Sequence, residues 1–299
     1  MSIYSQITSN KIRTFLILVI FIFLVSGFFF LVGQYFQSPE TYLVLGLFFS
    51  LSSGFVSYFY SDKIILLTVG AKPANKKEYF DFYTVTENLS IAAGLPIPKL
   101  YVITDPSPNA FATGRDPKHA VVCATTGLLE KLERKEIEGV VAHELSHIKN
   151  YDILLASIVS VLVGTVALVS DWIMRSFWWQ GYQQKRDYRE SKNPILSVLL
   201  ILALILAPLA ATLIQLAISR RREFLADASA ALLTRYPEGL ASALEKIAQD
   251  HHRLQTATTA TAHLFISSPF KKKGGYSWIL NLFSTHPPIE ERIKILRNM

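Results

Sequence analysis

Four long segments without a formal charge constrain the fold of this chain more than any other feature of its sequence. Each is at least 18 residues long and rich in Phe, Leu, Ile and Val. A helix needs about 20 apolar residues to cross the hydrocarbon core of a bilayer. The sequence therefore predicts a mainly α-helical membrane protein with four transmembrane helices, near residues 14–36, 41–60, 153–173 and 195–218.

The first of these segments has two interpretations. Lys11 and Arg13 precede it, as basic residues precede the core of a cleaved signal peptide. However, its apolar stretch is longer than the roughly 7–15 residues of such a core, and no Ala-x-Ala cleavage site follows it. We therefore expect a retained membrane anchor.

The distribution of Lys and Arg predicts the orientation in the membrane, because these residues favour the cytosolic side. Eleven lie between residues 61 and 152, twelve lie between 219 and the C-terminus, and none lies in the link 37–40. Both large soluble parts are therefore expected in the cytosol. Five more lie between the third and fourth segments, which fits a second hairpin less well. Those segments cross the bilayer, enter it partly, or pack against protein.

The bounds of the four apolar segments divide the chain into two membrane hairpins, 1–60 and 153–218, and two soluble parts, 61–152 and 219–299. Each soluble part alone is small for a hydrophobic core, so we expect one α+β domain assembled from both. Apolar patterns within it predict three strands and, besides the helix of the motif described below, three further helices. The helices cover 78–93, a stretch through Glu223 to Leu233, and 239–253, and the strands cover 99–103, 109–114 and 119–124.

The charge of the chain does not require a nucleic acid partner. The net charge is +7, and basic cytosolic loops that meet anionic lipid account for it. We expect the run Lys271–Lys273 to be a solvated or lipid-facing loop. Cys123 is the single cysteine, which excludes an intrachain disulfide. Its apolar neighbours predict a buried strand residue.

The motif His143-Glu144-Leu145-Ser146-His147 predicts a metal site. Residues i and i+4 lie above one another on a helix, so both imidazoles can reach one cation. Glu144 can then reach a water in the open coordination position, as a general base does in zinc proteases. Apolar residues at helical spacing support the helix: Ile137, Val140, Val141, Leu145 and Ile148. Gly139 interrupts them, and close approach of a neighbouring backbone would explain it.

A catalytic zinc site needs a third protein ligand. We expect Glu223, which shares a helix face with Asp227 four residues later. Asp227 would then accept a hydrogen bond from a ligand imidazole, preferably that of His143, and fix its orientation. The cofactor predicted is one Zn²⁺ ion.

Taken in order along the chain, the motifs resemble those of the HtpX family of bacterial membrane-bound zinc metalloproteases. More distantly they resemble the CaaX prenyl proteases and the mitochondrial stress proteases. The similarity covers a membrane hairpin, Asn109–Ala112, the His143–His147 motif, a second hairpin, Glu223–Asp227 and Thr285–Pro288. It implies a cytosolic zincin-like domain in the bacterial cytoplasmic membrane. It also implies an endopeptidase that acts on misfolded or damaged membrane proteins in quality control and stress response.

The same resemblance assigns further roles. The strand Asn109, Ala110, Phe111, Ala112 would border the cleft and pair with an extended polypeptide substrate. His286 would lie close to the cleft and stabilise the oxyanion, and Arg292 would support the site. The alternatives are a turn residue for His286 and a surface salt bridge with Glu290 or Glu291 for Arg292.

Two other functions remain open from the sequence. A prenyl-protein processing enzyme would share this site but would need a chamber built from more membrane helices. A membrane adaptor with a structural zinc would have no use for the base Glu144.

Overall fold

The computed structural model describes residues 3–35, 37–183, 220–269 and 287–299. Three features predicted above lie outside them: the fourth membrane segment near 195–218, the run Lys271–Lys273, and His286.

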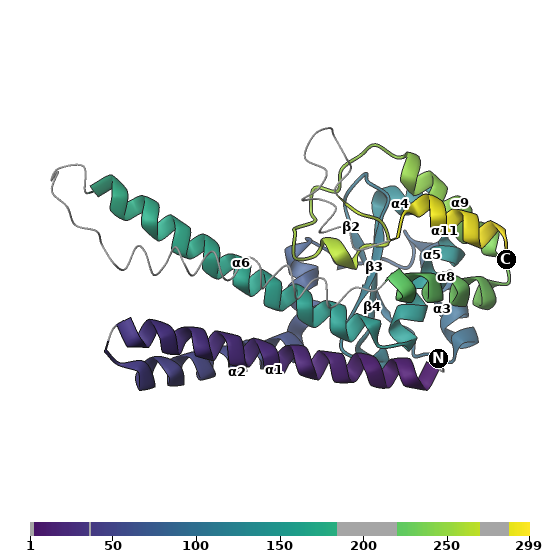
Figure 1. Cartoon of the computed structure of the whole chain (residues 1–299). Coiled ribbons are helices and arrows are strands. Elements are labelled where there is room, and N and C mark those ends of the chain that lie inside the picture. Colours follow the sequence, from purple (N-terminus) through teal and green to yellow (C-terminus); the bar gives the residue numbers. More distant parts are fainter. Residues whose placement is uncertain (1–2, 36, 184–219, 270–286) are drawn as a thin grey trace.

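The N-terminal part is a hairpin of two long helices, α1 (Ile3–Tyr35) and α2 (Pro39–Thr68) (Figure 1). Among the described residues, these are the two unbroken helices that are long and apolar enough to span a membrane, over Gln6–Gln34 and Pro39–Thr68. The hairpin packs closely where a Cβ on Gly46 would lie 2.6 Å from Cβ of Phe29.

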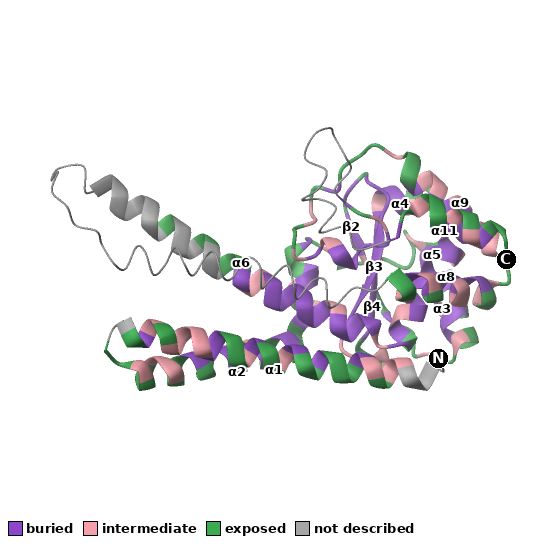
Figure 2. Ribbon diagram, in the orientation of Figure 1, coloured by how far each residue is buried: buried purple, intermediate pink, exposed green. Residues whose placement is uncertain are grey.

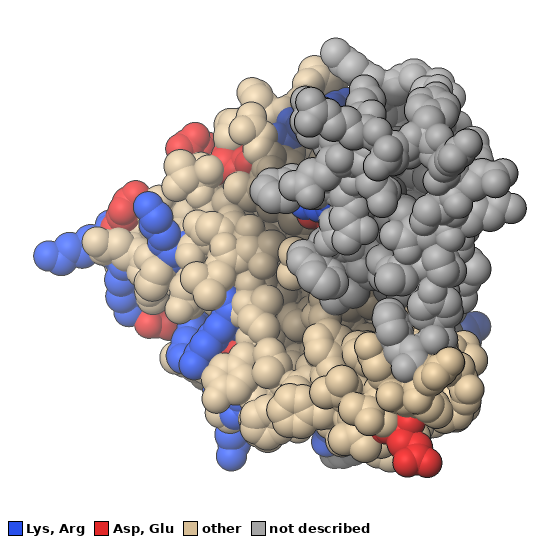
Figure 3. All heavy atoms as spheres, turned by 90° about the vertical axis from the view of Figure 1, so that its left-hand side faces the viewer, with Lys and Arg blue, Asp and Glu red and all other residues tan. Residues whose placement is uncertain are grey.

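The hairpin presents apolar side chains on its outside. Among the most exposed are Phe15, Phe23, Leu31, Val44 and Phe48, with Phe23 at 76% and Phe48 at 72%. Figure 2 shows the two helices with mostly exposed and intermediate residues, in contrast to the buried centre of the molecule. The end-on view in Figure 3 shows a largely uncharged surface in its lower part, with charged side chains gathered toward the left edge. Such a surface suits a hydrocarbon environment.

Helix α2 does not end near residue 60 as predicted. It continues through Asp62 and Lys63 to Thr68, where Ile65 and Leu66 are buried beneath the sheet. The charged pair marks the end of the apolar run but does not stop a helix. The last two turns of α2 thus belong to the core of the soluble domain.

A four-stranded mixed sheet forms the centre of that domain. Its spatial order is β1 (Lys72–Pro73), β2 (Lys99–Ile103), β4 (Val121–Thr125), β3 (Ala110–Thr113). Strands β2 and β4 are parallel, and the other two pairs are antiparallel. Strands β2, β3 and β4 confirm the three predicted strands to within two residues. Strand β3 lies at an edge of the sheet.

Both faces of the sheet are buried. Successive side chains of a strand point to opposite sides, so each strand contributes to two separate hydrophobic clusters. Leu100, Val102 and Ala112 pack into the helical core, whereas Phe111 and Cys123 face the end of α2 and α6. Cys123 is fully buried, as predicted, and burial raises the pKa of its thiol.

Helix α5 (Arg134–Lys149) is the centre of the helical layer. It packs against α3 (Phe80–Ala93), α8 (Arg220–Thr234) and α9 (Pro237–Gln249). Helix α11 (Ile289–Arg297) covers α9. Two short helices lie against the sheet: α4 (Thr126–Lys131) contacts β4, and η2 (Ala262–Leu264) contacts β3 and α6. Residues from both soluble parts share one hydrophobic core.

The contact between α5 and α9 explains Gly139. A Cβ on this residue would lie 2.6 Å from the backbone N of Leu240, closer than any real contact. Glycine therefore lets the two backbones approach, which confirms the expectation for this position.

Helix α6 (Asp152–Gln183) carries the third predicted membrane segment and is longer than predicted. It leaves α5 at 84°, through Tyr151 in the left-handed region with φ of 60°. From Ile153 to Val166 it is mostly buried between α1 and the soluble domain (Figure 2). It continues beyond residue 173, and the exposed charges of Asp171 and Arg175 pair at i, i+4 within it.

Candidate active site

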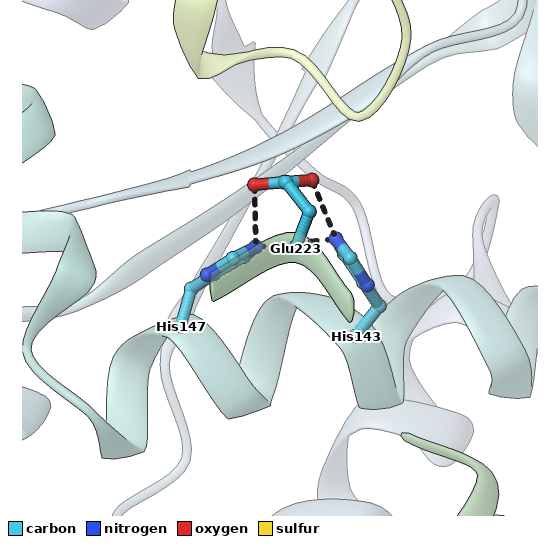
Figure 4. A group of neighbouring side chains, drawn as sticks. All are labelled: His143, His147 and Glu223. Atoms are coloured by element: carbon cyan, nitrogen blue, oxygen red, sulfur yellow. Dashed lines mark hydrogen bonds and ion pairs between the residues drawn. The ribbon is translucent and has the colours of Figure 1, made fainter. Parts of the chain in front are cut away.

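Two histidines of α5 and a glutamate of α8 point at one another (Figure 4). The Nε2 atoms of His143 and His147 are 3.1 Å apart. The two carboxylate oxygens of Glu223 lie 3.8 Å from His143 Nε2 and 3.7 Å from His147 Nε2. One ligand atom from each residue therefore faces a common point.

Two carboxylates fix the direction of both rings. His143 Nδ1 lies 2.9 Å from Asp227 Oδ1, and His147 Nδ1 lies 3.0 Å from Asp152 Oδ2. Each Nδ1 then carries the proton and donates it, so each Nε2 offers a lone pair to the common point.

This arrangement fits a cation of the zinc type. Zinc binds imidazole nitrogen at about 2.0–2.1 Å, so neighbouring donors of a tetrahedral site lie about 3.3 Å apart. The observed distances between donors, 3.1 to 3.8 Å, bracket that value. Two nitrogens and a carboxylate leave one position for water or substrate.

The charges around the two rings differ. Burial is the main influence on His143 and lowers its pKa to about 4, although Asp227 opposes it. Burial also disfavours a charge on His147, but Asp152 and Glu223 outweigh it and raise its pKa to about 9. A proton on Nε2 of His147 and a cation would occupy the same place, so metal binding would displace that proton.

Glu144 follows His143 on α5, is buried, and is not among the converging donors. Burial raises its pKa to about 7, and the charge of Glu223 adds to this shift. The backbone N–H of Ala112 on β3 acts in the other direction by hydrogen bonding to the carboxylate. A carboxyl that titrates near neutrality can take up and return a proton at physiological pH.

Arg292 on α11 is buried behind His143, with 1% of its surface exposed. The alternative of a surface salt bridge with Glu290 or Glu291 is therefore wrong. Its guanidinium donates to both oxygens of Asp227, at 2.8 and 2.7 Å, and to the carbonyl of Ile266 at 3.0 Å. Burial acts to lower the pKa of Arg292, but the carboxylate of Asp227 raises it.

Asp152 was not among the site residues predicted from the sequence. This residue is buried at the start of α6 and holds the ring of His147. The signal that could have found it is an acidic residue at the border of an apolar segment, five positions after the second histidine.

The strand predicted to bind substrate is partly covered by the chain itself. Ile266 N donates to the carbonyl of Ala110 at 2.9 Å, and the Asn109 side-chain amide donates to the carbonyl of Ser267 at 3.0 Å. The ring of Phe265 packs edge-on against Phe111. Ala112, at the other end of the strand, contacts Glu144 through its backbone N–H. His286 lies outside the described residues.

Comparisons with known proteins agree with this arrangement. The model of peptidase family M48 matches residues 80–299. A "Protease HtpX homolog" of Caldanaerobacter subterraneus is 44% identical, with 100% of this chain and 98% of the relative covered. Another of Dictyoglomus turgidum is 47% identical, with 99% of this chain and 94% of the relative covered.

A solved structure has a similar fold. The crystal structure of S. mikatae Ste24p matches with a TM-score of 0.52 at 18% identity, over 98% of this chain and 67% of that protein. With the family match, the full-length relatives and the two spanning helices, this chain is a membrane protein that belongs to the M48 family of metallopeptidases and resembles HtpX proteases over its whole length.

Proposed function

We propose that this protein is a zinc-dependent integral membrane endopeptidase. It hydrolyses peptide bonds of misfolded or damaged membrane proteins at the cytosolic face of the bacterial cytoplasmic membrane, in quality control under stress. The observation that carries this proposal is the convergence of His143, His147 and Glu223 beside the buried carboxyl of Glu144.

His143, His147 and Glu223 would hold the metal. Two imidazoles and one carboxylate with an open position favour zinc among divalent cations. When bound there, zinc supplies Lewis-acid chemistry, which polarises the scissile carbonyl and acidifies the attacking water.

The residues of the chain would perform the proton transfers. Glu144 accepts the proton of the attacking water and later gives it to the leaving amine. We assign Asp227 and Arg292 to the support of His143, since they form one hydrogen-bonded row behind it. His286 remains the proposed donor to the oxyanion.

An extended polypeptide would bind along β3, whose Asn109–Ala112 segment lies at the edge of the sheet. Because Ile266 already bonds to Ala110, we expect substrate to pair at the Ala112 end, next to Glu144. Main-chain pairing makes few demands on side chains, which suits varied misfolded substrates.

For the membrane arrangement we propose two hairpins, 1–60 and 153–218, with the soluble parts 61–152 and 219–299 forming a zincin-like domain in the cytosol. The exposed apolar surface of α1 and α2 supports the first hairpin. The second would begin in protein, since α6 is mostly buried as far as Val166, and enter lipid beyond it.

Casein degradation by the purified full-length protein tests this function. We expect activity that a zinc chelator removes and added Zn²⁺ restores, together with about one zinc per chain by metal analysis. Zinc binding without any proteolysis, in the presence of intact protein, would instead indicate a structural metal site. Proteolysis unaffected by complete metal removal would exclude the metallopeptidase.

A further inference from the structure

A buried polar cluster joins the N-terminal membrane helix to the candidate metal site. The side-chain amide of Asn10 on α1 donates to Asp152 Oδ1 at 2.7 Å and to the backbone carbonyl of Asn150 at 2.9 Å. The other oxygen of Asp152 accepts from His147 Nδ1 at 3.0 Å. Asn10 is 2% exposed. Two hydrogen bonds therefore connect α1 to a proposed metal ligand.

The same helix also contacts the corner from which Asp152 projects. Tyr151 turns the chain between α5 and α6 in a left-handed conformation, with φ of 60°. The ammonium of Lys11 lies 4.4 Å from the centroid of the Tyr151 ring, a cation–π distance. In Figure 1 the beginning of α1 lies beside the soluble domain, whereas the rest of the hairpin points away from it. The first turns of α1 thus hold the sharp corner that directs Asp152 back toward His147.

The two carboxylate oxygens of Asp152 bind different partners, and Asn10 binds the one that does not face His147. Oδ1 accepts from Asn10 and lies 3.2 Å from Nη1 of Arg222, which leaves Oδ2 for His147. Arg222 Nη1 also donates to Oδ1 of Asn10 at 3.3 Å, so Asn10 holds both groups. Asn10→Ala would remove the amide from Asp152 and the acceptor from Arg222, and the carboxylate would rotate toward the guanidinium. The imidazole of His147 would then lose the acceptor that fixes its direction and its tautomer.

We propose that Asn10 is a positioning residue of the metal site, which acts through Asp152 to orient His147. This proposal rests on the proposed function of His147 as a metal ligand. It makes the N-terminal hairpin a structural part of the site and not a membrane anchor alone. Asn10 lies outside residues 80–299, which match the peptidase family.

Zinc affinity of the full-length protein in detergent, measured by competition with a chelating dye, tests the proposal. Asn10→Ala should bind Zn²⁺ about tenfold more weakly, the lower end of the effect of groups that orient a metal-ligating histidine. When Co²⁺ fills the site, the visible absorption spectrum of Asn10→Ala should differ from that of the wild type, because the ligand geometry around the metal changes. Asn10→Ser serves as a second variant if the alanine variant folds poorly.

Thr14→Val is the matched control. Thr14 is buried one turn later on the same helix, and its hydroxyl donates to the Asn10 carbonyl, away from Asp152. This variant should keep wild-type zinc affinity and the wild-type Co²⁺ spectrum. Thermal unfolding of the metal-free proteins establishes that both variants are folded.

A double-mutant cycle with Asp152→Asn separates positioning from general support of the fold. If Asn10 acts through Asp152, Asn10→Ala should weaken zinc binding little further in the Asp152→Asn background. Additive losses, or equal affinities of Asn10→Ala and Thr14→Val, would overturn the proposal alone. A wild-type protein that binds no zinc would overturn the metal site as well, and so identify the failure of the proposed function.

Discussion

Arg292 of α11 and Asp227 of α8 form a bidentate ion pair directly behind His143. Each is 1% exposed, and the two donor–acceptor distances are 2.8 and 2.7 Å. Burial alone would raise the pKa of Asp227, but Arg292 lowers it to about 2. The carboxylate therefore stays ionised, and it accepts the hydrogen bond of the His143 ring at 2.9 Å.

Arg292→Leu should destabilise the protein and weaken zinc binding. It leaves Asp227 buried without its cation, and removal of one partner of a buried pair costs about 3–5 kcal/mol. Denaturant unfolding and zinc competition measure the two effects. Arg297→Ala is the control on the same helix, because its pairs with Glu238 and Glu245 are exposed and solvent screens them, so its loss should change stability far less. Equal stability of the two variants would contradict the structural role of Arg292.

Glu144→Gln should keep zinc and lose nearly all proteolysis. Glu144 stands outside the converging donors, so the metal has no reason to leave. Loss of a general base costs about 10²–10⁴-fold in rate. Casein turnover and zinc content of the variant check both statements. Glu138→Gln, an exchange at a more exposed position of the same helix, should match wild type in both. Near-normal turnover by Glu144→Gln would exclude it as the base.

The link between Glu136 of α5 and Lys246 of α9 predicts an acid-sensitive contact. Burial acts to raise the pKa of Glu136, but hydrogen bonds from Lys246 at 2.8 Å and Ser242 at 2.5 Å lower it below its ordinary 4.5. A carboxyl with a lowered folded pKa stabilises the fold above its unfolded pKa, and this contribution disappears as the pH falls.

Stability should therefore decline below about pH 4.5 in the wild type, and less steeply in Glu136→Gln. The denaturant midpoint of unfolding, measured at several pH values between about 7 and 3.5, gives the slope of stability against pH. Since other carboxylates also titrate there, the comparison with Glu138→Gln decides: that control should keep the wild-type slope. A Glu136→Gln slope equal to wild type would mean that the contact contributes nothing.

Local patterns were sufficient to predict the parts of the fold with a short sequence period. The i, i+4 spacing of His143 and His147 placed both on one helix face, and three short apolar segments bounded by turn residues became β2, β3 and β4. Glu223 and Asp227 face the two histidines, as their spacing predicted for a helix. Their assignment as ligand and support remains a proposal.

Contacts between distant segments left no such pattern. Asn10 and Asp152 are 142 residues apart, and neither differs locally from an ordinary polar residue of a helix. The overrun of α2 to Thr68 was missed for a related reason, since the burial of Ile65 depends on a sheet formed later in the chain. Short elements such as β1 and α4 have too few residues for a period to show.

Gly139→Ala should lower stability by about 1–3 kcal/mol, the range for overpacking a core. The added methyl would meet the backbone of Leu240 at 2.6 Å, and backbone cannot turn aside as a side chain can. Gly164→Ala on α6 is the counterpart, because its nearest neighbour would be the Cβ of Ala260 at 3.9 Å, an ordinary contact. That variant should be neutral or slightly stabilising, since alanine favours helix. Thermal unfolding of both variants is the measurement, and an equally stable Gly139→Ala would refute close packing.

The single native cysteine makes the membrane topology directly measurable. Cys123 is fully buried in β4, so a membrane-impermeant maleimide should leave the wild type unlabelled in intact cells and in inverted vesicles. Cysteines introduced one at a time at Lys118, Arg253 and Gln183 then report their own side of the membrane.

Lys118→Cys and Arg253→Cys should label from the cytosolic side alone, because the basic soluble parts they belong to favour that side. Gln183→Cys, at the end of α6, should label from the outside if the second hairpin crosses the bilayer. Gln183 is the decisive position, because α6 is buried in protein as far as Val166. About 17 residues of helix remain beyond Val166, or about 26 Å at 1.5 Å per residue, which is close to the thickness of the hydrocarbon core. Cytosolic labelling of Gln183→Cys would mean that α6 does not cross the membrane. Outside labelling of Lys118→Cys would reverse the whole orientation and move the proposed site away from cytosolic substrates.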